Sequence, residues 1–199
     1  MSSQDEDRAY LEAALPELEA YLLSADTYRQ LDVSYHGSSL PALSLGNVLL
    51  TRARLGGSHG EGPTVPPTGT KDEGLLTQLD ELHVHWVSHW EQKAAQELRV
   101  RLGLWQDYLE ELVQSPSDHA SDYGYQVRQR VIIELLKTET GGQVPAEIER
   151  IAHLDDRLRA LTQPAPFAWE AELQAVFPST NYWFLYRRPP KRQAGQAKD

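Results

Sequence analysis

The dominant pattern in the sequence is a stripe of apolar residues that repeats about every 3.7 positions between Leu75 and Val113. Its members are Leu79, Leu82, Trp86, Trp90, Ala94, Leu98, Leu102, Trp105, Leu109 and Leu112. This spacing is that of one face of an α-helix and predicts a single long helix in the middle of the chain. At about 1.5 Å per residue, an unbroken helix over this run would be about 58 Å long. We therefore expect it to form the spine of the protein, with Gly103 as the one position where a bend is permitted.

Shorter segments on both sides of this run show the same helical spacing. Helices are predicted over residues 11–22, 45–55, 127–136 and 148–161, with a further short helix over 169–177. Pro16 falls inside the first of them and is expected to kink or restart it, because proline removes an amide donor. Ser44 is a suitable N-cap for the second, and Pro145 suits the first turn of the fourth. The segment between the first two helices predicts irregular structure.

The remaining segments do not show a helical period. Residues 56–74 are rich in Gly, Pro and Thr and predict a flexible loop, because they contain too little apolar surface to offset the entropy of ordering. Residues 181–186 read Asn-Tyr-Trp-Phe-Leu-Tyr and predict an extended aromatic segment across the bundle. Residues 187–199 predict a disordered basic tail. Together these patterns predict an all-α fold, a single-domain bundle of five to six helices over residues 1–186 around one long Trp-rich central helix.

Composition narrows the classes of function. The chain has 199 residues and no cysteine, which excludes disulfides, zinc-thiolate sites and cysteine nucleophiles. A net charge of -10 argues against direct binding to nucleic acid or to anionic lipid. No apolar run approaches the length of a membrane span, and the N-terminus is acidic rather than a basic and then apolar signal. The sequence therefore predicts a soluble cytoplasmic protein without a membrane association.

Three of the seven histidines crowd into residues 83–89, inside the predicted long helix. His85 and His89 are four positions apart, a spacing at which one helix face can hold a transition metal such as Zn or Fe, whereas His83 would point away from them. A metal site would need further ligands from other helices. The alternative is that these histidines cap the edge of the tryptophan stripe with hydrogen bonds, and on that interpretation the protein holds no cofactor.

Two predicted helices each carry an Arg-x-Arg pair next to apolar positions. These are Arg99 with Arg101 and Arg128 with Arg130. They either pair with Glu residues across the bundle or line a groove that binds a carboxylate or a phosphate. A phosphate-binding glycine loop and a dinucleotide-binding fingerprint are both missing from the sequence.

Three phrases of the sequence carry a resemblance to a known family. They are Tyr21-Leu22-Leu23-Ser24, Leu43-Ser44-Leu45-Gly46 and Tyr182-Trp183-Phe184-Leu185-Tyr186, in this order around a Trp-rich central helix. In these the chain resembles an all-helical bacterial family with no assigned activity. The resemblance covers most of the chain and implies a bacterial, cytosolic protein, with no catalytic residues to transfer.

The sequence favours a non-enzymatic interaction or adaptor subunit that docks to a protein partner or to a second copy of itself. Trp183, Tyr186, Arg187 and Arg188 are the expected contact residues, because tryptophan, tyrosine and arginine are enriched at binding hot spots. One alternative is a metal-dependent helical-bundle enzyme that uses His85 and His89. Another is an accessory subunit of a nucleic-acid-associated complex in which neighbouring chains supply the missing positive charge.

Overall fold

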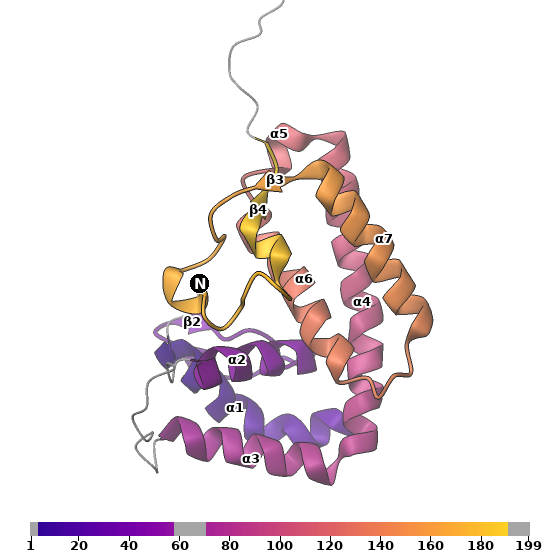
Figure 1. Cartoon of the computed structure of the whole chain (residues 1–199). Helices are drawn as coiled ribbons and strands as arrows, with labels where there is room; N and C mark the ends of the chain where they lie inside the picture. Colours follow the sequence, from indigo (N-terminus) through magenta and orange to yellow (C-terminus); the bar gives the residue numbers. More distant parts are fainter. Residues whose placement is uncertain (1–3, 58–70, 191–199) are drawn as a thin grey trace, which may run out of the picture.

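The computed structural model describes residues 4–57 and 71–190 and confirms the all-α fold. Most of the described residues are helical, and the strands form two short antiparallel pairs (Figure 1). Most of the loop predicted over residues 56–74 and the end of the tail predicted over 187–199 lie outside the described residues.

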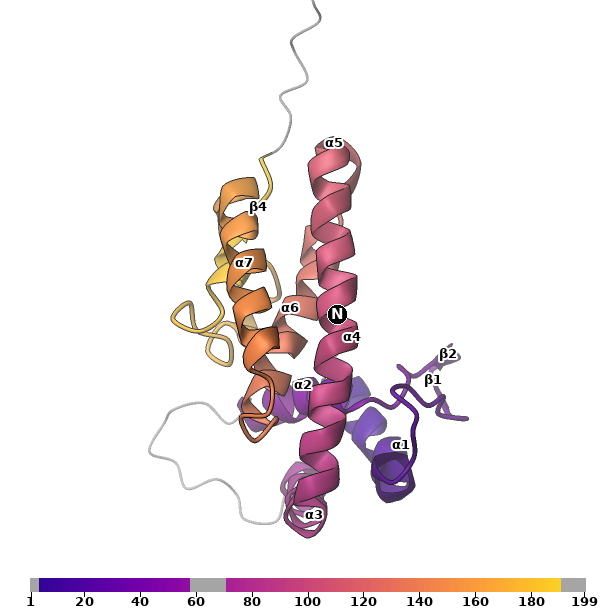
Figure 2. The ribbon, with the colours of Figure 1, turned by 90° about the vertical axis from the view of Figure 1, so that its right-hand side faces the viewer.

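Helix α4 (Val87–Gln114) is the spine of the molecule, about 42 Å long at about 1.5 Å per residue. It continues through Gly103 without a break. Helices α6 (Tyr123–Thr138) and α7 (Pro145–Leu161) pack along it (Figure 2). The side chains that α4 buries include the predicted stripe Trp90, Ala94, Leu98, Leu102, Trp105, Leu109 and Leu112.

The predicted central helix is not continuous, which is a correction to the sequence analysis. Helix α3 (Lys71–His85) ends before Trp86, whose φ of -115° and ψ of 30° lie outside the helical region, and α4 begins after it. The two helices then point in different directions, with α3 lying across one end of α4 (Figure 1). The bend lets Leu79 pack against α1, where it is fully buried, while the stripe of α4 packs against α6. The apolar spacing continues in register across the bend, so it does not reveal the break.

Helices α1 (Gln4–Leu22) and α2 (Leu45–Gly57) form a lower layer with α3, and α4 runs through this layer and the one above it (Figures 1 and 2). Helix α1 continues through Pro16 instead of restarting there. Ser44 caps α2 as predicted, because its Oγ accepts a hydrogen bond from the amide of Asn47 at 3.2 Å.

A small hairpin of β1 (Ser34–Tyr35) and β2 (Ser38–Ser39) lies between α1 and α2, in a segment that the sequence assigned to irregular structure. Its turn contains Gly37 at a φ of 81°, a conformation that favours glycine.

Short turns connect the helices of the upper layer. The four-residue helix α5 (Pro116–His119) follows α4 directly. After α6, Gly141 and Gly142 both adopt positive φ, and Pro145 then occupies the first position of α7, as the sequence predicts. Positive φ is strained for residues with a side chain, so this pair of glycines suits the turn between α6 and α7.

The C-terminal segment differs from its prediction. Residues 169–177 form only the single 3-10 turn η1 (Ala171–Leu173), and the aromatic run forms the 3-10 helix η2 (Trp183–Tyr186) instead of an extended segment. β4 (Arg187–Arg188) then pairs with β3 (Gln163–Pro164), which places the first two residues of the predicted tail in a strand. Phe184 and Leu185 are fully buried, and the Phe184 carbonyl accepts a hydrogen bond from the Tyr123 hydroxyl at 2.7 Å. The segment is therefore part of the core.

Candidate functional site

His85 and His89 do not share a helix, so the spacing on which the metal hypothesis depends is absent. Residue 85 ends α3 and residue 89 lies in the first turn of α4. Both imidazoles instead meet the indole of Trp86 edge-on, with ring centroids 5.0 and 5.3 Å apart. Within residues 4–57 and 71–190, no group of three His, Asp or Glu side chains is arranged to hold a metal ion.

His83 is the histidine of this run that meets a carboxylate. Its ring stacks on Trp90 at a centroid distance of 4.5 Å, and its Nε2 lies 3.7 Å from the Glu139 Oε2. The same oxygen accepts a hydrogen bond from the Trp90 Nε1 at 2.9 Å. This cluster joins α3, α4 and the end of α6, and its contacts are those of a structural anchor.

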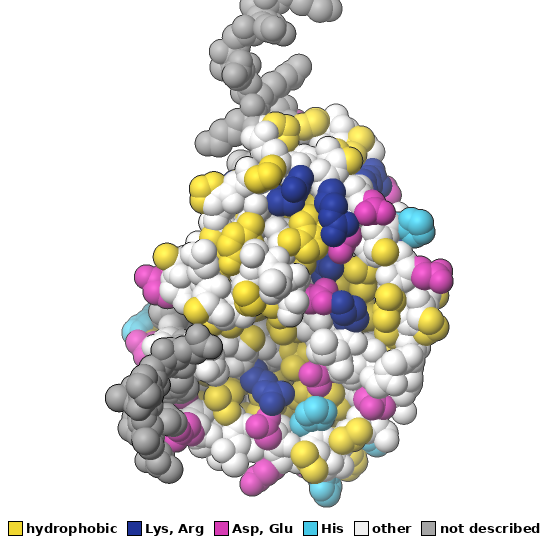
Figure 3. All heavy atoms as spheres, in the orientation of Figure 1, with side chains coloured by type: hydrophobic (Ala, Val, Ile, Leu, Met, Phe, Trp, Pro, Cys, Tyr) yellow, Lys and Arg dark blue, Asp and Glu magenta, His cyan; other side chains and the backbone are white. Residues whose placement is uncertain are grey.

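The predicted contact residues at the C-terminus make many contacts within the chain. Trp183 lies under two guanidinium groups, with the Arg159 carbon 4.1 Å and the Arg187 carbon 6.0 Å from the ring centroid. Arg187 also donates hydrogen bonds to the Thr162 hydroxyl and to the carbonyls of Thr162 and Arg159. The Tyr186 hydroxyl donates to the Phe177 carbonyl at 3.0 Å, whereas Arg188 is exposed. Basic side chains gather over this part of the surface in Figure 3.

Three of the four arginines in the Arg-x-Arg pairs bind carboxylates, but only the pair of Arg99 with Glu147 is of the predicted kind, a Glu on another helix. Arg101 binds Glu97 within α4 at 2.8 Å, and Arg130 binds both oxygens of Asp155 at 2.8 and 2.9 Å. Burial alone would lower the pKa of Arg130, but the hydrogen bonds and charge of Asp155 raise it above its ordinary value. At the surface, Arg99 donates to Glu147 at 2.6 Å and lowers the pKa of that carboxyl. The fourth arginine, Arg128, has a different environment, described below.

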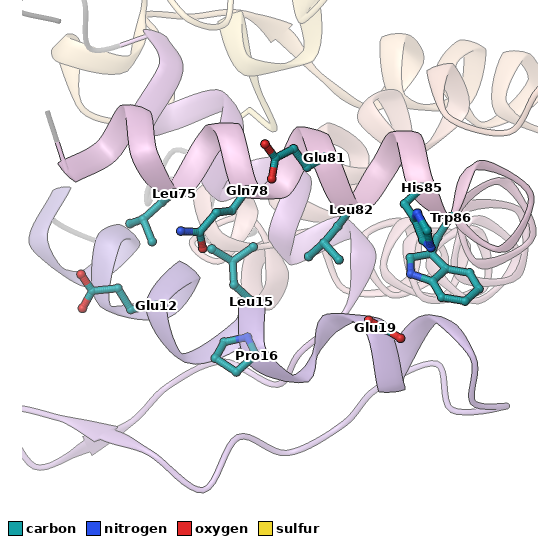
Figure 4. Close-up of a pocket in the computed structure, with 10 residues that line it drawn as sticks. All are labelled: Glu12, Leu15, Pro16, Glu19, Leu75, Gln78, Glu81, Leu82, His85 and Trp86. Atoms are coloured by element: carbon teal, nitrogen blue, oxygen red, sulfur yellow. The ribbon is translucent and has the colours of Figure 1, made fainter. Parts of the chain in front are cut away.

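An apolar groove of about 600 Å³ lies between α1 and α3 (Figure 4). Leu15 and Pro16 of α1 face Leu75 and Leu82 of α3 across it. The two helices run in the same direction along the groove, and Trp86 lies at the end where α3 finishes. Because Pro16 is exposed and Leu75, Leu82 and Trp86 are only half-buried, the groove keeps an accessible apolar lining.

Acidic side chains border this lining. Glu12, Glu19 and Glu81 all line the groove and are exposed. Glu12 forms an ion pair with Lys71, whereas Glu19 and Glu81 have no hydrogen-bond or ion-pair partner among the described residues. The groove thus combines an apolar floor with two carboxylates that no described residue pairs with.

Trp86 has two roles, as the residue at the bend and as the end wall of the groove. Its indole Nε1 is buried and has no hydrogen-bond partner within the described parts of the chain. A buried donor without a hydrogen-bond partner costs about 1–3 kcal/mol, so burial of the Trp86 indole nitrogen lowers the stability of the folded state by about this amount. The indole ring also packs against the imidazoles of His85 and His89.

The groove itself does not follow from the sequence, although one signal for it is present there. Glu12 and Glu19 are seven positions apart, so they lie on the same face of a helix as Leu15 and Pro16. A mixed acidic and apolar face on α1 is visible in the sequence, but the pairing of that face with α3 is not.

Comparison with known proteins identifies no relative, since no protein-family model, no curated protein and no solved structure matches the chain. None of the helices in the described part of the chain combines the length and apolar character needed to cross a membrane.

Proposed function

We propose that the protein is a non-enzymatic interaction module that binds a basic amphipathic helix of a partner protein in the groove between α1 and α3. The observation that carries the proposal is the combination, in one groove, of an apolar floor and carboxylates without partners at Glu19 and Glu81. This proposal keeps the adaptor function favoured by the sequence but moves the contact site from the C-terminal aromatic residues to the lower layer.

The dimensions of the groove suit a helix. The lining of α1 extends from Glu12 to Glu19, about two helical turns, and that of α3 from Leu75 to Trp86, about three turns. A peptide helix that lays its apolar face into a hydrophobic groove uses anchors at positions i, i+3, i+4 and i+7, which span the same length. Leu82 and Trp86 would receive such anchors.

Charge determines which helix is favoured. A partner whose polar face carries Lys or Arg would pair with Glu19 and Glu81, while an acidic helix would be repelled by the same groups. The net charge of -10 adds a long-range attraction for basic segments that speeds their encounter with the protein.

The test is binding of a fluorescent helical peptide of Leu and Lys, about five turns long, to the full chain, measured by fluorescence anisotropy. A peptide with Glu in place of every Lys is the comparison ligand. We expect the basic peptide to bind with saturation and the acidic peptide not to bind. In the double variant Glu19→Lys, Glu81→Lys we expect the affinity for the basic peptide to fall at least tenfold.

A matched control separates specific docking from general attraction to an acidic protein. The double variant Glu149→Lys, Glu172→Lys produces the same change in net charge at exposed positions away from the groove. We expect it to retain the affinity of the wild type within about twofold, because each exposed charge acts weakly at a distance. Equal losses in both double variants, or no binding of the basic peptide, would contradict the proposal. Self-association of the wild type that the groove variant abolishes would replace the partner helix with a second copy of the chain.

A further inference from the structure

A second cavity, of about 220 Å³, lies where the N-terminal turn of α6 approaches α1 and α2. It is lined by Arg54, Arg128, Tyr125 and Trp169, with Glu6 and Pro41 completing its wall. Sites for drug-sized ligands measure roughly 300–1,000 Å³, so this cavity suits a smaller molecule.

Among the four arginines of the Arg-x-Arg pairs, Arg128 is the one that forms no ion pair with a carboxylate of the described residues. Its Nη2 donates to the Asn47 side-chain oxygen at 3.0 Å, and its Nε is buried without a hydrogen-bond partner among the described residues. Its pKa is lowered first by burial and then by the positive charges of Arg54 and Arg101. The surroundings of this guanidinium therefore disfavour its charge, the reverse of the situation at Arg130.

The neighbouring arginines do have carboxylate partners. Arg54 lies 3.4 Å from the Asp7 carboxylate, and Arg101 lies 2.8 Å from the Glu97 carboxylate. Each of these pairs offsets its own charge, whereas no carboxylate, Glu6 on the cavity wall included, is among the groups that act on the pKa of Arg128.

The aromatic wall of the cavity is held in place. The Trp169 Nε1 donates to the Gly124 carbonyl at 2.9 Å, and the Arg54 guanidinium lies over the indole at 5.6 Å. Tyr125 is largely exposed at the cavity and marks its opening to solvent. The cavity thus combines an aromatic wall with a few polar groups, Arg54 and Arg128 on the basic side and Glu6 on the acidic side, as in pockets that bind small molecules.

We propose that this cavity binds a small oxyanion, the carboxylate or phosphate group of a small molecule, with Arg128 as the cation that pairs with it. A guanidinium suits both groups, because it donates several hydrogen bonds in one plane, and Arg128 uses one of its nitrogens on Asn47 and forms no ion pair in the described structure. The sequence leaves open whether an Arg-x-Arg pair binds a carboxylate or a phosphate. We assign this binding role to Arg128. The proposal is independent of peptide binding in the groove.

The experiment is isothermal titration of the full chain with sodium phosphate and, in a second arm, with sodium succinate, each against sodium chloride at equal ionic strength. We expect saturable one-site binding of at least one probe, and the stronger arm identifies phosphate or carboxylate as the preferred group. Arg128→Gln should weaken that binding at least tenfold, while Arg128→Lys, which keeps the charge but not the fork, should weaken it severalfold. Arg99→Gln, which removes an arginine at the surface of α4, should leave it unchanged.

Absence of saturation with both probes in the wild type would overturn the proposal, as would unchanged binding in Arg128→Gln. If Arg128→Gln does not fold, Arg128→Lys decides the question, because a site elsewhere would bind the probe as in the wild type. The groove variant Glu19→Lys, Glu81→Lys should bind the anion normally, so failure of the groove proposal would not affect this test.

Discussion

Two surfaces of the protein have similar residues: the surface around Trp183 and the groove between α1 and α3 both combine aromatic and apolar side chains with charged ones at their edges. They differ in whether the charged side chains are bonded to other parts of the chain. At Trp183 the guanidinium groups of Arg159 and Arg187 stack on the ring, and Arg187 also donates to backbone carbonyls. In the groove, Glu19 and Glu81 have no such partner in the described structure. The first region is thus engaged in holding the C-terminal segment to the bundle, and the second is available to another molecule. Residue type alone does not distinguish these two situations.

The largest effect is expected at the buried ion pair beneath the C-terminal segment. Asp155→Ala removes two of the acceptors of Arg130 and leaves its guanidinium, 4.5 Å from the Phe184 ring, with Glu134 as its remaining carboxylate partner among the described residues. Removing one partner of a buried ion pair typically costs about 3–5 kcal/mol, and the contact to Glu134 places the expected loss at the lower end of this range. Urea denaturation would measure the loss in free energy of unfolding. The neighbouring Asp156→Ala, at an exposed pair with Arg159, is the control and should cost less than about 1 kcal/mol. Equal losses in the two variants would show that the buried ion pair contributes no more to stability than the exposed one.

A smaller loss is expected when the contacts of β4 are removed. Arg187→Ala deletes three hydrogen bonds to Thr162 and Arg159. We therefore expect the free energy of unfolding to fall by about 1–2 kcal/mol. Arg188→Ala, at the exposed neighbour, should leave the free energy of unfolding within about 0.5 kcal/mol of the wild type. Thermal unfolding of both variants measures the difference. If Arg187→Ala were as stable as Arg188→Ala, the contacts of Arg187 would not hold the C-terminal segment to the bundle. The proposed difference between this surface and the groove would then be wrong.

Lowering the pH is expected to reduce the stability of the region around Arg130, because Glu134 then loses its negative charge. Burial alone would raise the pKa of Glu134, but hydrogen bonds and charge from Lys137 and Arg130 lower it below its ordinary value of 4.5. A carboxyl with a lowered pKa in the folded state stabilises the protein above its unfolded pKa, and the stabilisation is lost as the pH falls through the folded pKa. Glu134→Gln should therefore cost about 1 kcal/mol at pH 7 and progressively less towards pH 3. Denaturation of both proteins across this range provides the test, and a difference that grew at low pH would contradict it.

The smallest effect on stability is expected in the groove itself. Glu19→Gln and Glu81→Gln remove exposed carboxylates without partners in the described structure, so each should change the free energy of unfolding by less than about 0.5 kcal/mol. Thermal and urea unfolding would show this. A loss of 1 kcal/mol or more would mean that these groups stabilise the fold, and that the groove is not available for binding.

Several elements could be predicted because the information for them is local. The caps and breakers at Ser44, Gly141, Gly142 and Pro145 act within one turn of the chain, and the structure places them as expected. The exposed acidic residues of α1 and the buried tryptophans of α4 follow from the same helical spacing. Pairing of the arginines with Glu residues on other helices was one of two alternatives from the sequence, and neither the Asp155 partner of Arg130 nor the same-helix partner of Arg101 follows from it.

The bend at Trp86 shows where local information ends. Leu82, Trp86 and Trp90 keep the helical spacing, so a straight helix and a broken one give the same apolar pattern. The break arises because α1 lies beside α3 and α6 lies beside α4, and two separate packing partners together outweigh one continuous helix. The bend also places His85 at the end of α3 and His89 in the first turn of α4, so the two do not share the single helix face from which the metal hypothesis was argued.

The sequence by itself determined the all-α class, most helix positions and the net charge, because these depend on residue type and on spacing within a few turns. Tertiary structure alone decided which charges are neutralised and which are left over. Arg128 and Arg130 are two positions apart on one helix, yet Arg130 pairs with Asp155 of α7, whereas Arg128 forms no ion pair with a carboxylate among the described residues. Electrostatic partners separated by many residues are brought together by helix packing, and the location of the candidate sites depends on that packing.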